Sequence, residues 1–516
     1  MTARRTGVPD RLVRLADAVL LPCFDGLIAP EWVQRRVAEG MGGVCLFARN
    51  VESTEQVASL SEALVSANSD VVIAIDEEAG DVTRMDAATG SRFPGAWALG
   101  RVDDTTLTTI IGRQVGELLR LAGVSLNLAP SADVALNPAN PVIGSRAFGA
   151  DPELVARHTA AWIHGQQAAG VAACAKHFPG HGDTTTDSHH SVAVVSGDLA
   201  TLRRQALPPF AAAVAAGTAA IMSGHLVVPA VDDVPATISF RWLTEVLRGE
   251  LGFTGVIVTD ALEMAGIAAV YGIRGAAVRS LIAGADLLCI GGQTRPESEI
   301  DTIRDAIVDA VLDGSLPEER LAQAAARSKT VGVRAARRTA EVNAEVTAKT
   351  GVAAVDNAST TGSRTSQSIN IVGSHSMTVA LNATQTAGPL PPLRGPILVL
   401  RCLDTPNTAV GIVPWGPATV LTLDTDEIVL RNTDHVPADS VRAAGIVLVV
   451  TRDRHRSPWM VRVLGAVRSV RPDTVLIEMG ISGVTDADAP AIASFGATRA
   501  NTRAVVELLR GAAVTA

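Results

Sequence analysis

The stretch from Lys176 to His189 holds a dense group of acid and base side chains. It reads KHFPGHGDTTTDSH, follows an apolar run, and contains six ionisable side chains among glycine and proline residues. Glycine and proline shape loops, and a shaped loop with many such groups is typical of a site for binding or proton transfer. The chain has three lysines, Lys176, Lys329 and Lys349. Because arginine supplies the other formal positive charge, Lys176 marks a place that needs a compact ammonium donor.

A second carboxylate, Asp260, ends the apolar run Gly255–Asp260. A fixed carboxylate can act as a nucleophile, and cleavage of a glycosidic bond with retention also needs a proton donor for the leaving oxygen. Asp187 and His189 can supply that donor, because a carboxylate two residues from an imidazole can fix its tautomer and support an imidazolium. The side chains left to bind sugar hydroxyls are those of Asp76, Lys176, His177 and an arginine.

The same side chains also have plain structural interpretations. An aspartate at a strand end, such as Asp260, is often a helix N-cap or a solvated loop residue. His225 fits a partly buried histidine that is bonded to a backbone carbonyl. Arg146 fits an ordinary salt bridge in a loop.

A metal site is a further interpretation of the histidines in this region. The candidate ligands are His177, His181, Asp183, Asp187, His189 and His190. The sequence has no H-E-x-x-H or paired C-x-x-C motif, and glycines flank His181 as in a tight turn. The pattern therefore favours a site without a metal or other cofactor.

Eight short apolar runs recur between alanine-rich, helix-like stretches. They are Ala18–Phe24, Gly43–Phe47, Val71–Asp76, Val124–Leu128, Val171–His177, Ala219–His225, Gly255–Asp260 and Asp286–Gly291. Runs that are apolar on both faces, most with enough chain between them for a helix, are what parallel strands with crossover helices require. They predict a (β/α)8 TIM-type barrel of the α/β class, in which the chemistry lies at the carboxyl ends of the strands. The polar residues at or near those ends are Asp76, Asn127, Lys176, His177, His225 and Asp260.

The rest of the chain predicts a linker and a smaller open α/β domain. We assign residues 1–340 to the barrel, 341–369 to the linker and 370–516 to the second domain, because Val352–Ile369 is rich in Ser, Thr, Gly and Asn. The strands expected in the second domain are Pro396–Arg401, Thr419–Leu423, Ile446–Thr451 and Thr474–Met479, with a helix at Pro458–Val470.

Composition restricts the classes of partner. The net charge of −9 argues against a nucleic-acid or anionic-membrane surface, both of which favour basic patches. We identify no run of about 20 apolar residues that could span a bilayer, and no export signal. The five cysteines are odd in number and lack paired spacing, which is typical of reduced thiols and predicts a cytoplasmic location. A small molecule is the expected partner.

Several motifs together resemble the β-N-acetylglucosaminidase branch of family 3 glycoside hydrolases. The segments that carry the resemblance are Phe47–Asn50, Phe93–Gly95, Asn127–Pro130, Ile143–Phe148, Lys176–Asp183, Asp187–His189, Pro235–Ser239 and Val258–Met264. The resemblance implies that Asp260 is the nucleophile and that His189 with Asp187 is the acid/base on a mobile loop. It also implies that Asp76, Arg146, Lys176 and His177 hold the terminal sugar.

One segment departs from the pattern of that family. Residues Asp76–Asp81 read DEEAGD, where the family usually reads DQEGGR. Ala79 therefore stands in place of a glycine and Asp81 in place of an arginine. We expect altered backbone freedom and a lost positive charge beside the sugar.

The resemblance implies a retaining exo-acting β-N-acetylhexosaminidase that releases terminal β-linked GlcNAc from cell-wall fragments, as in peptidoglycan recycling, or from chitin-like oligosaccharides. A phosphorylase is an alternative, because an imidazole acid/base presents less negative charge to phosphate than a carboxylate does. A β-glucosidase of the same family and a non-catalytic sugar-binding protein are further alternatives.

Overall fold

The computed structural model divides the chain into two compact units, each described here by itself. The described residues are 8–188, 191–350, 374–391, 393, 395–404, 407–421, 424–432, 435–484 and 489–511, without the side chains of 334–340 and 342–350. The first unit comprises Met1–Glu77, Gly112–Pro141 and Ala150–Asp356. The second comprises Glu78–Ile111, Val142–Gly149 and Asn357–Ala516.

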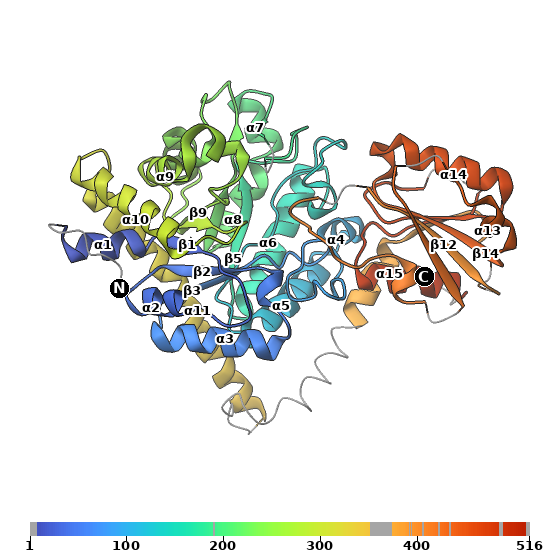
Figure 1. The fold of residues 1–516 in the computed structure, drawn as a ribbon, viewed down its shortest axis with the longest axis horizontal. Coiled ribbons are helices and arrows are strands. Elements are labelled where there is room, and N and C mark those ends of the chain that lie inside the picture. Colours follow the sequence, from blue (N-terminus) through green and yellow to red (C-terminus); the bar gives the residue numbers. More distant parts are fainter. Residues whose placement is uncertain are drawn as a thin grey trace. The chain divides into compact units, whose positions relative to one another are not determined.

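The eight predicted strands of the first unit are present and form the predicted barrel. They are β1 (Leu20–Pro22), β2 (Gly43–Leu46), β3 (Val72–Ile75), β4 (Leu126–Asn127), β5 (Ala172–Phe178), β7 (Ala220–Ser223), β9 (Val256–Thr259) and β10 (Leu288–Ile290). Strands β2, β3, β4, β5, β7 and β9 pair in that order, all parallel, and β10 pairs with β1. A bridge between Val258 and Leu287 joins β9 to the start of β10, and β1 lies beside β2. The chain order of the strands is thus kept around the barrel, and Figure 1 shows β1, β2 and β3 as neighbours.

Helices cover the outside of these strands. They are α1 (Asp10–Asp17), α2 (Glu31–Ala38), α3 (Thr54–Ala67), α5 (Thr105–Leu121), α6 (Pro152–Ala168), α7 (Leu199–Gln205), α8 (Pro208–Ala215), η4 (Arg241–Glu250), α9 (Ala265–Ala283), α10 (Glu297–Leu312) and α11 (Glu318–Thr350). A short parallel pair, β6 (Ala193–Val194) with β8 (Leu226–Val227), lies in the connections after β5 and β7.

Both faces of the barrel strands are buried, which explains why they appear as uninterrupted apolar runs. Inward residues such as Leu21, Cys45 and Cys289 form one cluster inside the barrel, whereas Ile221 and Ile257 pack in a second cluster with the helices. Small inward side chains suit the narrow interior of an eight-stranded barrel. The burial of these thiols also explains two of the five unpaired cysteines.

The main body of the second unit is a doubly wound sheet. Its strand order is β11-β16-β15-β14-β12-β13, and only the edge strand β11 is antiparallel. The strands are β11 (Gln385–Ala387), β12 (Ile397–Cys402), β13 (Thr425–Leu430), β14 (Ile446–Thr451), β15 (Val475–Glu478) and β16 (Ala491–Ala493). The helices that flank it are α13 (Ala438–Ala443), α14 (Pro458–Val470) and α15 (Arg499–Leu509). The smaller open α/β domain is therefore confirmed.

Two details of the predicted second half are wrong. The strand expected at Thr419–Leu423 is absent from its described residues, because Pro417 starts the 3-10 turn η5 (Pro417–Thr419), and the actual strand is β13. Helix α11 continues to Thr350, so residues 341–350 are helical rather than linker. Residues 351–369 of the predicted linker lie outside the described residues.

One helix bears on the predicted absence of a membrane-spanning run, although Arg274 and Arg279 interrupt its apolar residues. Helix α9 is 19 residues long with a mean hydropathy of 1.2, so by length and composition alone it could cross a membrane. It packs against α10 and is followed by β10 of the barrel. A core helix passes the same test, so this helix is weak evidence for a membrane span.

Candidate active site

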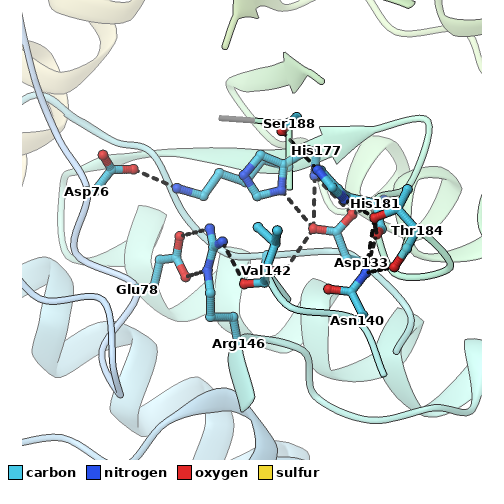
Figure 2. A network of polar contacts seen from close by, with 12 residues as sticks. Asp76, Glu78, Asp133, Asn140, Val142, Arg146, His177, His181, Thr184 and Ser188 are labelled. Carbon is cyan, nitrogen blue, oxygen red and sulfur yellow. Dashed lines mark hydrogen bonds and ion pairs between the residues drawn. The ribbon is translucent and has the colours of Figure 1, made fainter. Parts of the chain in front are cut away.

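An ion pair joins the ends of two barrel strands. Lys176, in β5, donates from Nζ to Asp76 Oδ1 at 2.6 Å, and Asp76 follows β3 directly (Figure 2). The Lys176 side chain is only 3% exposed, whereas that of Asp76 is 17% exposed. Because the carboxyl ends of parallel strands lie on one edge, the predicted convergence of these two residues is confirmed.

The pairing of the strands brings Asp260 to the same edge, where its backbone N donates to Ser223 O at the end of β7 at 2.9 Å. Burial raises the pKa of the Cys174 thiol, and the charges of Lys176, Asp76 and Asp260 all act on that thiol as well. Asp260 follows β9, is partly exposed, and accepts a hydrogen bond at Oδ1 from Ala261 N at 2.8 Å. The structure thus places the Asp260 carboxylate at the carboxyl end of its strand, on the edge of the sheet where Asp76 and Lys176 also lie.

His225 has the structural role that its surroundings suggested. Its ring is fully buried, and Nε2 lies 2.9 Å from the carbonyl oxygen of Ala261. A carbonyl oxygen only accepts, so Nε2 carries a proton, while Nδ1 lies 2.9 Å from the Thr237 hydroxyl. His225 therefore fixes the residue that follows Asp260.

Asp133 organises the loop after β5 and was not among the residues predicted from the sequence. This fully buried carboxylate accepts hydrogen bonds from His177 Nδ1 at 2.7 Å and from His181 N at 2.6 Å (Figure 2). Burial alone would raise the pKa of Asp133, but the charge and hydrogen bond of His177, with further help from His181, hold that pKa below its ordinary value. An ionised Asp133 thereby fixes His177 and the turn at His181.

The ring of His181 extends this network toward the predicted acid/base. Its nitrogens contact the hydroxyls of Thr184 at 2.7 Å and Ser188 at 3.0 Å. The carbonyl of Ser188 accepts a hydrogen bond from Gly266 N at 3.1 Å. A Cβ at Gly266 would lie 2.9 Å from that oxygen, so glycine is needed for this approach. Asp187 is therefore held beside the connection that follows Asp260.

Two of the candidate histidines, His189 and His190, lie outside the described residues. The predicted acid/base role of His189 thus stays a prediction from sequence. Among the residues that the structure describes, no three His, Cys, Asp or Glu side chains form a group that could hold a metal ion.

The burial of His181 predicts a measurable pH dependence of stability. Burial, with the nearby charge of His177, lowers the pKa of His181 from 6.5 to about 4. Above about pH 6.5 neither the folded nor the unfolded chain is protonated at this ring, whereas between the two values mainly the unfolded chain binds the proton. This group alone should therefore make the folded state about 2 kcal/mol less stable at about pH 5 than at about pH 7.5.

Thermal unfolding of His181→Asn at both pH values tests this expectation. The parent should lose more Tm than the variant between about pH 7.5 and about pH 5. His164→Asn, which removes an exposed imidazole from α6, measures the effect of losing any histidine. An equal loss of Tm in the parent and in His181→Asn would rule out His181 as the source.

Arg146 lies in the second unit, with the residues that follow Glu77. It forms a bidentate pair with Glu78, at 2.9 Å from Nε to Oε2 and 2.7 Å from Nη2 to Oε1. Both side chains are almost fully buried, so the pair is not an ordinary surface salt bridge. Ala79 adopts a φ of +58°, a conformation that favours glycine, which matches the expected change in backbone freedom.

Asn127 ends β4, as expected, and acts on the backbone next to Asp76. Its side chain accepts from Glu77 N at 2.9 Å and donates to Glu77 O at 2.8 Å, so it fixes the backbone directly after Asp76.

A cavity of about 810 Å³ lies elsewhere, between α9 and α10, and none of the predicted site residues lines it. The site is therefore defined by strand ends and not by this cavity.

Comparisons with known proteins identify the family to which the chain is similar. The model of the Glycosyl hydrolase family 3 N terminal domain matches residues 29–331. The chain is 34% identical to Beta-hexosaminidase A of Pseudoalteromonas piscicida over 325 residues. The aligned stretch covers 58% of this chain and 54% of that relative. It thus spans about half the length of that relative.

Two further proteins are similar over larger shares of their length. Beta-hexosaminidase of Stenotrophomonas maltophilia (strain R551-3) is 38% identical over 267 residues, which is 50% of this chain and 78% of that protein. A solved structure with a TM-score of 0.82 and 28% sequence identity is that of a glycoside hydrolase family 3 beta-N-acetylglucosaminidase from Paenibacillus sp. str. FPU-7. The superposition covers 97% of this chain and 96% of the Paenibacillus chain.

Proposed function

The chain belongs to glycosyl hydrolase family 3, and from this membership we propose that it is a retaining exo-β-N-acetylglucosaminidase. Its substrates would be cell-wall fragments or chitin-like oligosaccharides that end in β-linked GlcNAc. The observation that carries the proposal is the position of Asp76, Lys176 and Asp260 at the carboxyl ends of β3, β5 and β9, where the first two form an ion pair. The names of the similar proteins support the choice of sugar.

In the proposed reaction, Asp260 attacks the anomeric carbon and the glycosidic bond to the leaving oxygen breaks. The imidazolium of His189, supported by Asp187, gives its proton to that oxygen, and a covalent glycosyl-enzyme remains. Water then gives a proton to His189 while its oxygen attacks the anomeric carbon. Asp260 leaves as a carboxylate, so GlcNAc is released with its β configuration retained.

Substrate preference tests the proposal. We expect kcat/KM for 4-nitrophenyl β-GlcNAc to exceed that for the matching β-glucoside by at least about 100-fold, because the acetamido group offers an additional hydrogen-bonding partner. Initial rates of the full chain on both substrates provide the measurement. A preference for the glucoside would contradict the sugar assignment and favour a β-glucosidase.

Product analysis separates hydrolysis from phosphorolysis. The parent protein should release free GlcNAc at the same rate with and without about 10 mM phosphate, an excess chosen to saturate a typical enzyme site. Exclusive formation of GlcNAc 1-phosphate would favour the phosphorylase. Binding of GlcNAc without turnover of any aryl glycoside would favour a sugar-binding protein.

We also propose a cytoplasmic location. Support comes from the five cysteines, which are all buried and unpaired, as is usual for proteins kept in a reducing compartment. Fractionation of cells that produce the protein should recover the activity with cytoplasmic markers, and recovery with external fractions would contradict this.

A further inference from the structure

A buried cluster of acidic and basic groups surrounds Arg146 within the second unit. Glu78 and Asp81 provide two carboxylates, each less than one-tenth exposed. Glu78 pairs with the guanidinium of Arg146. Asp81 Oδ2 accepts hydrogen bonds from the Ser145 hydroxyl and from Arg452 Nη2, and the distance to Arg452 is 2.6 Å. Two guanidinium groups thus balance two carboxylates.

Arg452 therefore reaches Arg146 through a short chain of contacts. Asp81 binds Ser145, the residue directly before Arg146. Figure 2 shows that Glu78 binds Arg146 itself. Without Arg452, the Asp81 side chain, only 4% exposed, would keep a hydroxyl partner but lose its guanidinium. A buried carboxylate without a compensating cation is costly, so the Asp81–Arg146 region would rearrange.

Other hydrogen bonds attach the same two segments to the second domain. Asn407 Nδ2 donates to Val142 O at 2.9 Å, and that carbonyl also accepts from Arg146 Nη1 at 3.2 Å. Arg84 Nη2 donates to Ala409 O at 2.9 Å. The positions of Arg146 and of the Glu78–Asp81 turn thus depend on the loops of this domain.

These loops follow the two strands at the switch point of the doubly wound sheet. In the sheet, β12 lies between β13 and β14. After β12 the chain forms β13 on one side of it, whereas β14 and then β15 follow on the other side. Asn407 and Ala409 follow β12, and Arg452 directly follows β14. Open α/β sheets hold ligands outside the carboxyl ends of such strands. In this chain, Asp81, Arg84 and Val142 contact these loops there.

We propose that Arg452 is a positioning residue, which holds Arg146 in the conformation that binds the sugar, by neutralising Asp81. This inference rests on the proposed role of Arg146 in sugar binding, but not on the identity of the sugar. Asp81 is one of the residues that depart from the family pattern, in which an arginine usually stands at this position. Arg452, the partner of Asp81, restores a positive charge there.

A double-mutant cycle on Arg452 and Asp81 tests the inference. Arg452→Met should raise KM about tenfold and change kcat less than about twofold, because it disturbs binding and not the reacting groups. Arg452→Lys should recover part of the loss. Asp81→Asn combined with Arg452→Met should bring KM back to within about threefold of the parent, because the uncompensated charge is then gone.

Arg401→Met is the matched control. Arg401 pairs with Glu427 at 2.8 Å within the same sheet and is 19% exposed, close to the 22% of Arg452. It should leave KM unchanged. Each variant is measured on whichever aryl glycoside the parent turns over, so a wrong sugar assignment does not affect the cycle. An unchanged KM in Arg452→Met, or strictly additive effects in the double variant, would overturn the inference, even if Tm falls.

Discussion

Replacement of Asp260 by alanine should lower kcat/KM for an aryl β-GlcNAc substrate by more than about 1,000-fold, because it removes the atom that forms the bond to the sugar. Asp260 stands directly after β9, and the hydrogen bond from Ala261 N at 2.8 Å fixes its carboxylate. His225 holds the carbonyl of Ala261 in turn. The nucleophile would thus be positioned before the substrate binds, which is where much of the rate advantage of an enzyme arises.

Asp260→Asn provides the matched variant. Its amide oxygen can still accept from Ala261 N, but an amide does not attack the sugar, so this variant should be as inactive as the alanine variant. Azide added to Asp260→Ala should restore turnover of an activated aryl substrate and yield the α-glycosyl azide, because azide attacks from the face that the carboxylate used. If Asp260→Asn keeps more than about a tenth of the parent activity, Asp260 is not the nucleophile.

The barrel could be predicted because its strands carry their own signal. Strands buried on both faces appear as short apolar runs, and the spacing between runs admits a helix. Strand β13 gave no such signal, because it is an edge strand and carries Asp426 and Glu427 at exposed positions. The run at Thr419–Leu423 was more apolar, but Pro417 turns the chain there.

The candidate site was predictable only where a residue stands at a strand end. Asp76, Lys176 and Asp260 obey that rule, since topology alone places them together. Asp133 lies 44 residues before His177, and Asp81 lies 371 residues before Arg452, so no local pattern links the partners. Such contacts follow from packing between distant segments, and a single sequence contains no periodicity that encodes them.

Lys176→Met should lower kcat/KM by about 100- to 1,000-fold, because it removes one partner of a nearly buried charge pair. The ammonium lies 2.6 Å from Asp76 in a space where the lysine side chain is 3% exposed. Loss of the ammonium removes this positive charge from beside the Asp76 carboxylate, at the point where the sugar hydroxyls would bind. Both KM and kcat should change, since a misplaced sugar reacts slowly.

Two variants separate a need for an ammonium from a need for any positive charge. Lys176→Arg should remain within about tenfold of Lys176→Met, because the larger planar guanidinium does not fit a buried position that holds a thin stem. Lys329→Met removes an exposed lysine from α11 and should leave the kinetics unchanged. If Lys176→Arg retains near-parent activity, charge alone suffices, and the scarcity of lysine in this chain does not mark a requirement at Lys176.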